Sequence, residues 1–90
     1  MTSWEGYRRN PDVSWRTIEG QAVLVFNREG EIQVLNEVGT HVWEHIGEAP
    51  ESMARNIASA YDVSEQEALR DVGAFLEALK GSGAILPAEG

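Results

Sequence analysis

The sequence predicts an α+β domain, in which a three-stranded antiparallel sheet is followed by three helices in a winged-helix-like order. Residues 13–35 are rich in β-branched and aromatic side chains and are divided by turn signals, which indicates short strands. From Asn36 onward the apolar residues recur at the spacing of an amphipathic helix instead. A length of 90 residues allows one modest core, and the absence of cysteine excludes disulfides and thiolate chemistry.

The first residues of the chain show no sustained periodicity, and Pro11 interrupts them. We therefore expect an irregular N-terminal arm at residues 1–12, ahead of a folded domain at residues 13–86. Trp4 and Tyr7 stand out because a segment without a core of its own spends no large apolar side chains on its own fold. They are either aromatics with a binding role or, more simply, anchors that pack the arm over the sheet.

Three short strands are expected in the next part of the chain. Val13–Glu19 alternates in part, which places Trp15 on the same face as Val13. Gln21–Asn27 is a short apolar run typical of a buried strand, and Glu31–Leu35 is the third strand. Glycines in both connections favour tight turns, so the strands should form an antiparallel meander.

The first helix is expected to begin after Asn36, whose side chain can accept a hydrogen bond from an unpaired amide of the first turn. Val38, Val42 and Ile46 then form one apolar stripe at helical spacing. Gly47 is the expected end of this helix.

The second helix is expected to follow Pro50 and to end at Asp62. Ser64 and Glu67 form a capping box, so the third helix should begin there and run to about Lys80. Two glycines mark its end, and the apolar residues behind them are expected to fold back onto the domain: Gly81, Gly83 and residues 84–87.

The charge of the chain argues against polyanionic partners. The net charge is −8, from 15 acidic and 7 basic residues, and nearly all of the excess lies after residue 36. Nucleic-acid binding depends on neutralising phosphates, and anionic membranes attract basic segments, so we expect neither partner. No apolar run approaches the roughly 20 residues that span a bilayer, and the start lacks the features of a signal peptide. We therefore expect a cytoplasmic protein.

The polar side chains do not form a recognisable catalytic pattern. No serine stands in the glycine-flanked strand–turn–helix context of a nucleophile elbow. A group of acids around the start of the third helix could in principle pair for acid–base work, but Glu67 belongs to the capping box, and acids stabilise a helix start. We therefore predict that the protein is not an enzyme and needs no cofactor. The group consists of Asp62, Glu65, Glu67 and Asp71.

His41 and His45 are four residues apart, which places both imidazoles on one face of the first helix, as a two-ligand metal site requires. A zinc site needs a third protein ligand, and the glutamate of the zincin motif is not in its place. The simpler interpretation is a pair of solvated surface histidines, although the sequence leaves metal binding by this pair open.

The strongest candidate for a binding site is the free edge that an outer strand of a small sheet must have. A helix beside such an edge forms a groove in which an extended peptide can add a strand. Ala74 and Ala78 would leave room there for the side chains of a peptide, although two small residues equally permit close packing of helix on sheet. The candidate binding residues are Glu31, Ile32, Gln33, Val34 and Leu35 in the third strand, and Arg70, Asp71, Ala74 and Ala78 on the third helix.

Two other functions fit the same architecture. A winged-helix regulator would read DNA with the third helix, but this helix has two basic residues against four acidic ones, and phosphates would repel it. A structural module could instead pair its edge strands into a homodimer. The charged residues of the third helix are Arg70, Lys80, Glu65, Glu67, Asp71 and Glu77.

An ordered set of short motifs resembles the PqqD-like family over about residues 10–86. The most specific piece is Leu35-Asn36-Glu37-Val38-Gly39-Thr40, followed by Val42-Trp43. The other pieces are Asn10-Pro11-Asp12-Val13 with Trp15-Arg16, Ala60-Tyr61-Asp62-Val63-Ser64, Asp71-Val72, Phe75-Leu76-Glu77-Ala78-Leu79 and Gly83-Ala84-Ile85.

The resemblance implies a recognition element for ribosomally made precursor peptides, a non-catalytic three-strand, three-helix domain. Such domains bind the leader of the precursor and present it to a modifying enzyme, such as a radical enzyme or a peptidase. In the family the leader pairs with the third strand and lies against the third helix, which implies Glu31–Leu35 and the Arg70–Ala78 flank here. Gln33 stands where relatives often carry an aromatic or apolar residue, so this edge is expected to be more polar than usual.

Overall fold

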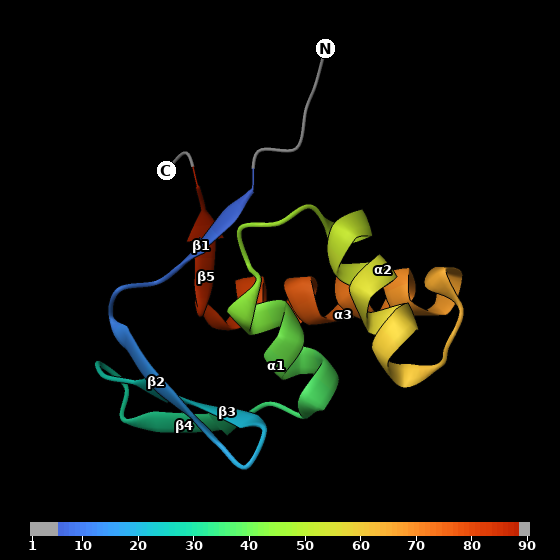
Figure 1. Ribbon diagram of the computed structural model, residues 1–90. Coiled ribbons are helices and arrows are strands. Elements are labelled where there is room, and N and C mark those ends of the chain that lie inside the picture. Colours follow the sequence, from blue (N-terminus) through green and yellow to red (C-terminus); the bar gives the residue numbers. More distant parts are fainter. Residues whose placement is uncertain (1–5, 89–90) are drawn as a thin grey trace.

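The computed structural model describes residues 6–88, and Figure 1 shows how their helices and strands are arranged. A three-stranded antiparallel sheet has the order β2-β3-β4, and the three helices follow it along the chain, which confirms the predicted α+β fold. The predicted anchor Trp4 lies outside the described residues. The elements of this part are β2 (Val13–Ile18), β3 (Gln21–Phe26), β4 (Glu31–Val34), α1 (Glu37–Glu44), α2 (Pro50–Tyr61) and α3 (Glu65–Ser82).

A second, two-stranded sheet pairs β1 (Tyr7–Arg9) with β5 (Ile85–Pro87). Irregular structure was expected over residues 1–12, so the strand at Tyr7–Arg9 corrects that expectation. Three residues are too few to show an alternating pattern, and their partner strand lies at the other end of the sequence. The return of the C-terminal segment onto the domain was predicted and is confirmed: the Asn10 amide donates to the Ala84 carbonyl oxygen over 2.9 Å.

Side chains alternate strictly along the central strand β3. Ala22, Leu24 and Phe26 are buried on one face, and Figure 1 shows the three helices gathered on that side of the sheet. Val13 is paired with Phe26, and Trp15 with Leu24, so both β2 residues share one face, as predicted, and this is the core face. The core therefore lies between one face of the sheet and the helices.

The ends of the helices mostly follow the predicted caps. The side-chain oxygen of Asn36 accepts from the Gly39 amide over 2.8 Å, and Ser64 Oγ accepts from the Glu67 amide over 3.0 Å. α1 ends at Glu44, three residues before the glycine expected to stop it. α3 continues past the first of its two terminal glycines and ends before Gly83, which has the left-handed φ of 83° that ends a helix.

Arg9 fastens the small sheet to the end of α1. Its Nε donates to the Trp43 carbonyl oxygen over 3.2 Å, and its Nη2 donates to that of Glu44 over 3.0 Å. The guanidinium also lies 4.9 Å from the centroid of the Trp15 ring, and the two tryptophan rings meet edge to face at 5.6 Å. One cation thereby pairs two helix-terminal carbonyls and covers two aromatic rings.

Gly39 brings α1 and α3 into direct contact. A Cβ atom at this position would lie only 2.5 Å from Cε1 of Phe75 on α3. Trp43 is fully buried on the same helix, one turn further on.

In the described part of the chain, no helix combines the length and apolar character needed to cross a membrane.

Candidate functional site

β4 forms an outer edge of the three-stranded sheet, since β3 is its neighbour in the sheet order. The Leu35 amide, just after β4, donates to the Ala22 carbonyl oxygen of β3 over 2.9 Å. Backbone groups alternate in direction along an antiparallel strand, so the amides of Ile32 and Val34 face away from β3. These two residues therefore present backbone donors and acceptors at the open edge of the sheet.

The side chains of β4 divide between the two faces of the sheet. Ile32 and Val34 are 66% and 57% exposed on the face away from the helices. Gln33 pairs with Leu24 and is half-buried on the helix side, and Glu31 shares that side. Leu35 lies just beyond the strand and is buried in the core. Of the five predicted edge residues, it is the one whose side chain packs inside the domain and is not free to contact a peptide.

α3 contacts the chain just after and just before β4. At one end, Phe75 packs on Gly39, which follows β4 in the chain. At the other end, Ser82 lines a small pocket together with Phe26 and Glu29, which precede β4. Ala78 is exposed and lies about one turn from both Phe75 and Ser82. The space between the edge of β4 and the flank of α3 over residues 75–82 is therefore the candidate binding channel.

The four α3 residues predicted to bind the peptide lie at different angles around the helix. Successive residues turn by about 100°, so Asp71 and Ala78 lie within about 60° of Phe75 around the helix, Ala74 at about 100° and Arg70 at about 140°. All four are exposed. Asp71 and Ala78 therefore share the flank beside β4, Ala74 lies at its rim, and Arg70 points farthest from it.

Phe75 and Ser82 also belong to this flank, and neither was predicted from the sequence as a binding residue. Phe75 is half-buried and borders the apolar stripe that Val72, Leu76 and Leu79 form at helical spacing. The signal that could have found it is its position between the two small residues Ala74 and Ala78, at the edge of that stripe.

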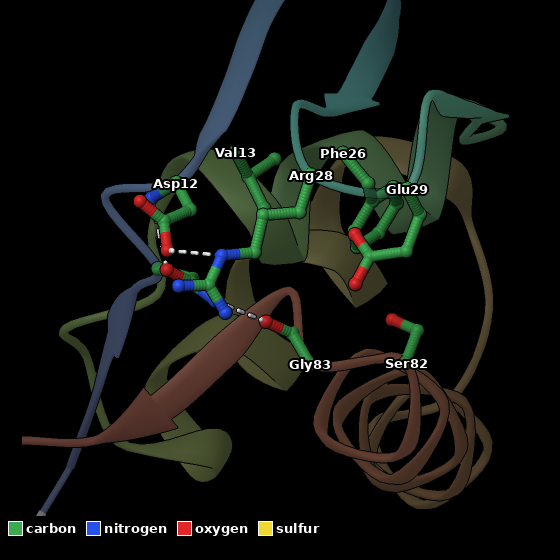
Figure 2. A pocket seen from close by; sticks show the side chains of 8 residues that line it. Asp12, Val13, Phe26, Arg28, Glu29, Ser82 and Gly83 are labelled. Atoms are coloured by element: carbon green, nitrogen blue, oxygen red, sulfur yellow. Dashed lines mark hydrogen bonds and ion pairs between the residues drawn. The ribbon is translucent and has the colours of Figure 1, made fainter.

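A polar pocket of about 120 Å³ lies where the turn before β4 meets the C-terminus of α3 (Figure 2). Arg28 Nε lies 3.9 Å from Asp12 Oδ2, and the Glu29 side chain extends toward the end of α3, where Ser82 lies. Asn10 Nδ2 donates to the Gly83 carbonyl oxygen over 2.9 Å, which ties the wall of the pocket to the C-terminus of α3. The pocket has room for little more than one side chain.

The two predicted surface histidines are stacked, and one is less solvated than expected. The His41 and His45 rings lie 4.2 Å apart, and His45 Nδ1 lies 2.9 Å from Glu48 Oε2. His41 Nε2 is buried, and within the described residues it has no hydrogen-bond partner. Burial lowers the pKa of His41, the charge of His45 lowers it further, and the nearby Glu48 and Glu44 act in the opposite direction.

The hydrogen bond from His45 lowers the pKa of the Glu48 carboxyl group, which also accepts from Ser52 Oγ over 3.1 Å. The described residues contain no group of three or more histidine, cysteine, aspartate or glutamate side chains arranged to hold a metal ion. The four acids considered for acid–base chemistry, Asp62, Glu65, Glu67 and Asp71, are all exposed.

A comparison with protein-family models matches residues 21–85 to the family described as Coenzyme PQQ synthesis protein D (PqqD). The chain belongs to the PqqD family. The matched range begins with β3 and ends in β5, so it includes β4 and all of α3. A comparison with curated proteins finds no match.

Two solved structures are similar to this PqqD family member over nearly its whole length. One is described as lasso peptide synthetase B1 complexed with the leader peptide; it has a TM-score of 0.83 and 30% identity, over 91% of this chain and 99% of its own. The other is TbiB1 in complex with the TbiA(beta) leader peptide, with a TM-score of 0.78 and 26% identity, over 87% of this chain and 93% of its own.

Proposed function

We propose that this PqqD family member is a non-catalytic adaptor that binds the leader of a ribosomally made precursor peptide and presents it to a peptide-modifying enzyme. The observation that carries the proposal is the open edge of β4, with contacts of α3 to the chain just before and just after that strand. The similarity to two structures that contain leader peptides supports it. Because a ribosomal product is the substrate, we place this encounter in the cytoplasm.

Strand addition explains both affinity and choice of peptide. The leader would lie along β4 and exchange backbone hydrogen bonds with Ile32 and Val34, which does not depend on the peptide sequence. Alternate side chains of the added strand would point into the channel, over Phe75 and Ala78, where an apolar side chain fits best. The sequence preference would therefore reside in every second leader residue.

The charge of the chain favours leaders or enzymes with basic segments. The net charge of −8 comes mostly from the helical half of the sequence, and α3, which borders the channel, carries Asp71 on the flank itself. Complementary charge accelerates association more than it strengthens the final complex. Strand addition itself requires no metal or cofactor, and the chemical step would belong to the partner enzyme.

The direct test is an NMR titration of isotope-labelled protein with the leader of a short precursor peptide encoded beside this chain. We expect saturable shifts at Glu31–Leu35 and along the α3 flank at residues 71–82. Saturable shifts confined to other elements would contradict the proposed site. If neighbouring leaders cause no shifts in the folded protein, the adaptor function itself is contradicted.

Two parallel measurements separate this function from the alternatives. A duplex DNA titration at low salt should leave the spectrum unchanged, because the acidic α3 repels phosphates. Sedimentation over a range of protein concentrations should show no dimer formed by pairing of edge strands. Salt-sensitive DNA binding would instead support the regulator, and a leader-insensitive dimer would support the structural module.

A further inference from the structure

The face of the β2-β3-β4 sheet that points away from the helices is unusually apolar. Solvent-facing sides of antiparallel sheets normally carry polar side chains. Here Ile18, Ile32 and Val34 are 50%, 66% and 57% exposed, and the register places the half-buried Val23 and Val25 between them. We call these five residues the outer sheet face. In the described part of the chain, the helices all lie on the other side of the sheet.

A shallow hollow and one cation mark this face. The hollow has a volume of about 210 Å³ and is lined by Val23 and Val25 together with Ser14, Trp15 and Arg16. The Arg16 side chain lies on the same side of the sheet as the five residues of the outer sheet face, because Arg16 pairs with Val23. Among the residues of the three strands, it is the one charged side chain on this face. A partner that fits here has an apolar patch with a carboxylate at its border.

The face is too small for a stable contact between two copies of this chain. The strands have six, six and four residues and cover roughly 250 Å², whereas a stable interface buries about 800 Å² on each partner. Two copies would also bring together equal net charges of −8. The like charges favour a different protein as the occupant, and the small area requires that its contact extend beyond the three strands.

A leader strand added to β4 would supply part of that extension. Side chains of an added strand alternate between the channel and the outer side of the sheet. Those on the outer side would continue the row formed by Ile32 and Val34. Leader binding would thus enlarge the outer sheet face.

We propose that the outer sheet face, extended by the bound leader, is the docking surface for the peptide-modifying enzyme, whose apolar patch meets Val23 and Val25 and whose carboxylate pairs with Arg16. This inference rests on the proposed adaptor function and names the surface through which it acts. The enzyme would contact adaptor and leader as one continuous sheet. Leader and enzyme therefore each strengthen the binding of the other to the adaptor.

The probe for this test is the purified peptide-modifying enzyme encoded beside this chain, with binding measured in the presence and absence of the leader. Leader should tighten the complex at least about tenfold. Arg16→Glu and Val25→Thr should each weaken enzyme binding by roughly tenfold or more, while their affinity for the leader stays unchanged, because both residues lie away from the β4 edge. Thr keeps the β-branched shape that a strand prefers.

The matched control is Arg55→Glu, an equal charge reversal on the exposed side of α2, which should bind the enzyme like the wild type. Enzyme binding that is insensitive to both sheet variants, or to the leader, overturns the docking surface while leaving leader binding intact. Absence of any enzyme binding overturns it as well. A leader that fails to bind the wild-type chain contradicts the adaptor function first. A dimer that Val25→Thr dissociates assigns the face to a second copy instead.

Discussion

At the scale of single residues, Gly39 sets the distance between α1 and α3. Its missing side chain leaves the space that the Phe75 ring occupies. Phe75 borders the proposed leader channel, so the contact also fixes one wall of the site. The sequence shows only a glycine in a helical stripe, a position where glycine normally costs helix stability. Its purpose became visible only with the neighbouring helix in place.

Replacing this glycine tests the contact. Gly39→Ala gains about 1 kcal/mol of helix propensity, but the overpacking against a ring costs about 1–3 kcal/mol. We expect a net loss of about 1 kcal/mol in the free energy of unfolding, measured by urea denaturation. Gly73→Ala is the matched control, because a Cβ there meets nothing within 4 Å, and it should stabilise the protein. A Gly39→Ala variant more stable than the wild type would show that Phe75 moves aside freely.

His41 predicts how stability depends on pH. Its pKa is lowered in the folded protein by burial and by His45, so the unfolded chain takes up a proton at a pH where the folded chain does not. Stability should therefore fall as pH drops below about 6.5 toward the lowered value. The lowered pKa of Glu48 adds a further loss at more acidic pH, as that carboxylate is protonated.

The measurement is the free energy of unfolding from about pH 7.5 to about pH 5.5, compared between the wild type and His41→Gln. The variant removes the titrating group and should flatten the slope in this range. An identical slope in both proteins would show that His41 is fully solvated in solution. His41 was expected on the surface because helical spacing indicates a face and does not reveal how closely the next segment covers it.

At the scale of elements, local signals predicted most of the fold. The strand at residues 21–26 and the caps at Asn36 and Ser64 depend on a few neighbouring residues, and the structure confirms each of them. The apolar run predicted a buried strand, but one face of β3 is only half-buried because no helix covers that side of the sheet. β1 and the Arg9 contacts were missed because both depend on residues far away in the sequence. Such contacts have no periodic pattern that a sequence could display.

The edge of β4 gives the sharpest test at this scale. Val34→Pro removes a backbone donor that faces away from β3, so it should weaken leader binding by about 1 kcal/mol or more. Affinity measured by calorimetry on the folded variant provides the check. Thr17→Pro is the matched control, because the pairing of β2 also turns the Thr17 amide outward, at the opposite edge of the sheet. Equal losses in both variants would indicate general damage to the sheet and contradict the β4 assignment.

At the scale of the whole molecule, the sheet is covered by helices on one face and open on the other (Figure 1). A free edge and an exposed helix flank follow from a small sheet with one helix beside it, and the family resemblance pointed to the third strand and the third helix as the binding site, which stays a prediction. The sequence did not reveal which turn of α3 lies beside β4. Arg70 was selected for its position in sequence, whereas Phe75 and Ser82 hold the two ends of the flank. That alignment follows from the packing of α1 between sheet and helix, which no local pattern encodes.

The measurement that tests strand addition most directly is amide hydrogen exchange, followed residue by residue with and without the encoded leader. The amides of Ile32 and Val34 face the open edge and should exchange readily in the free protein, then become strongly protected when leader is bound. The amides of Trp15 and Thr17 at the opposite edge should exchange at the same rate in both states. Protection at the β2 edge, or bound leader with Ile32 and Val34 still unprotected, would contradict the account.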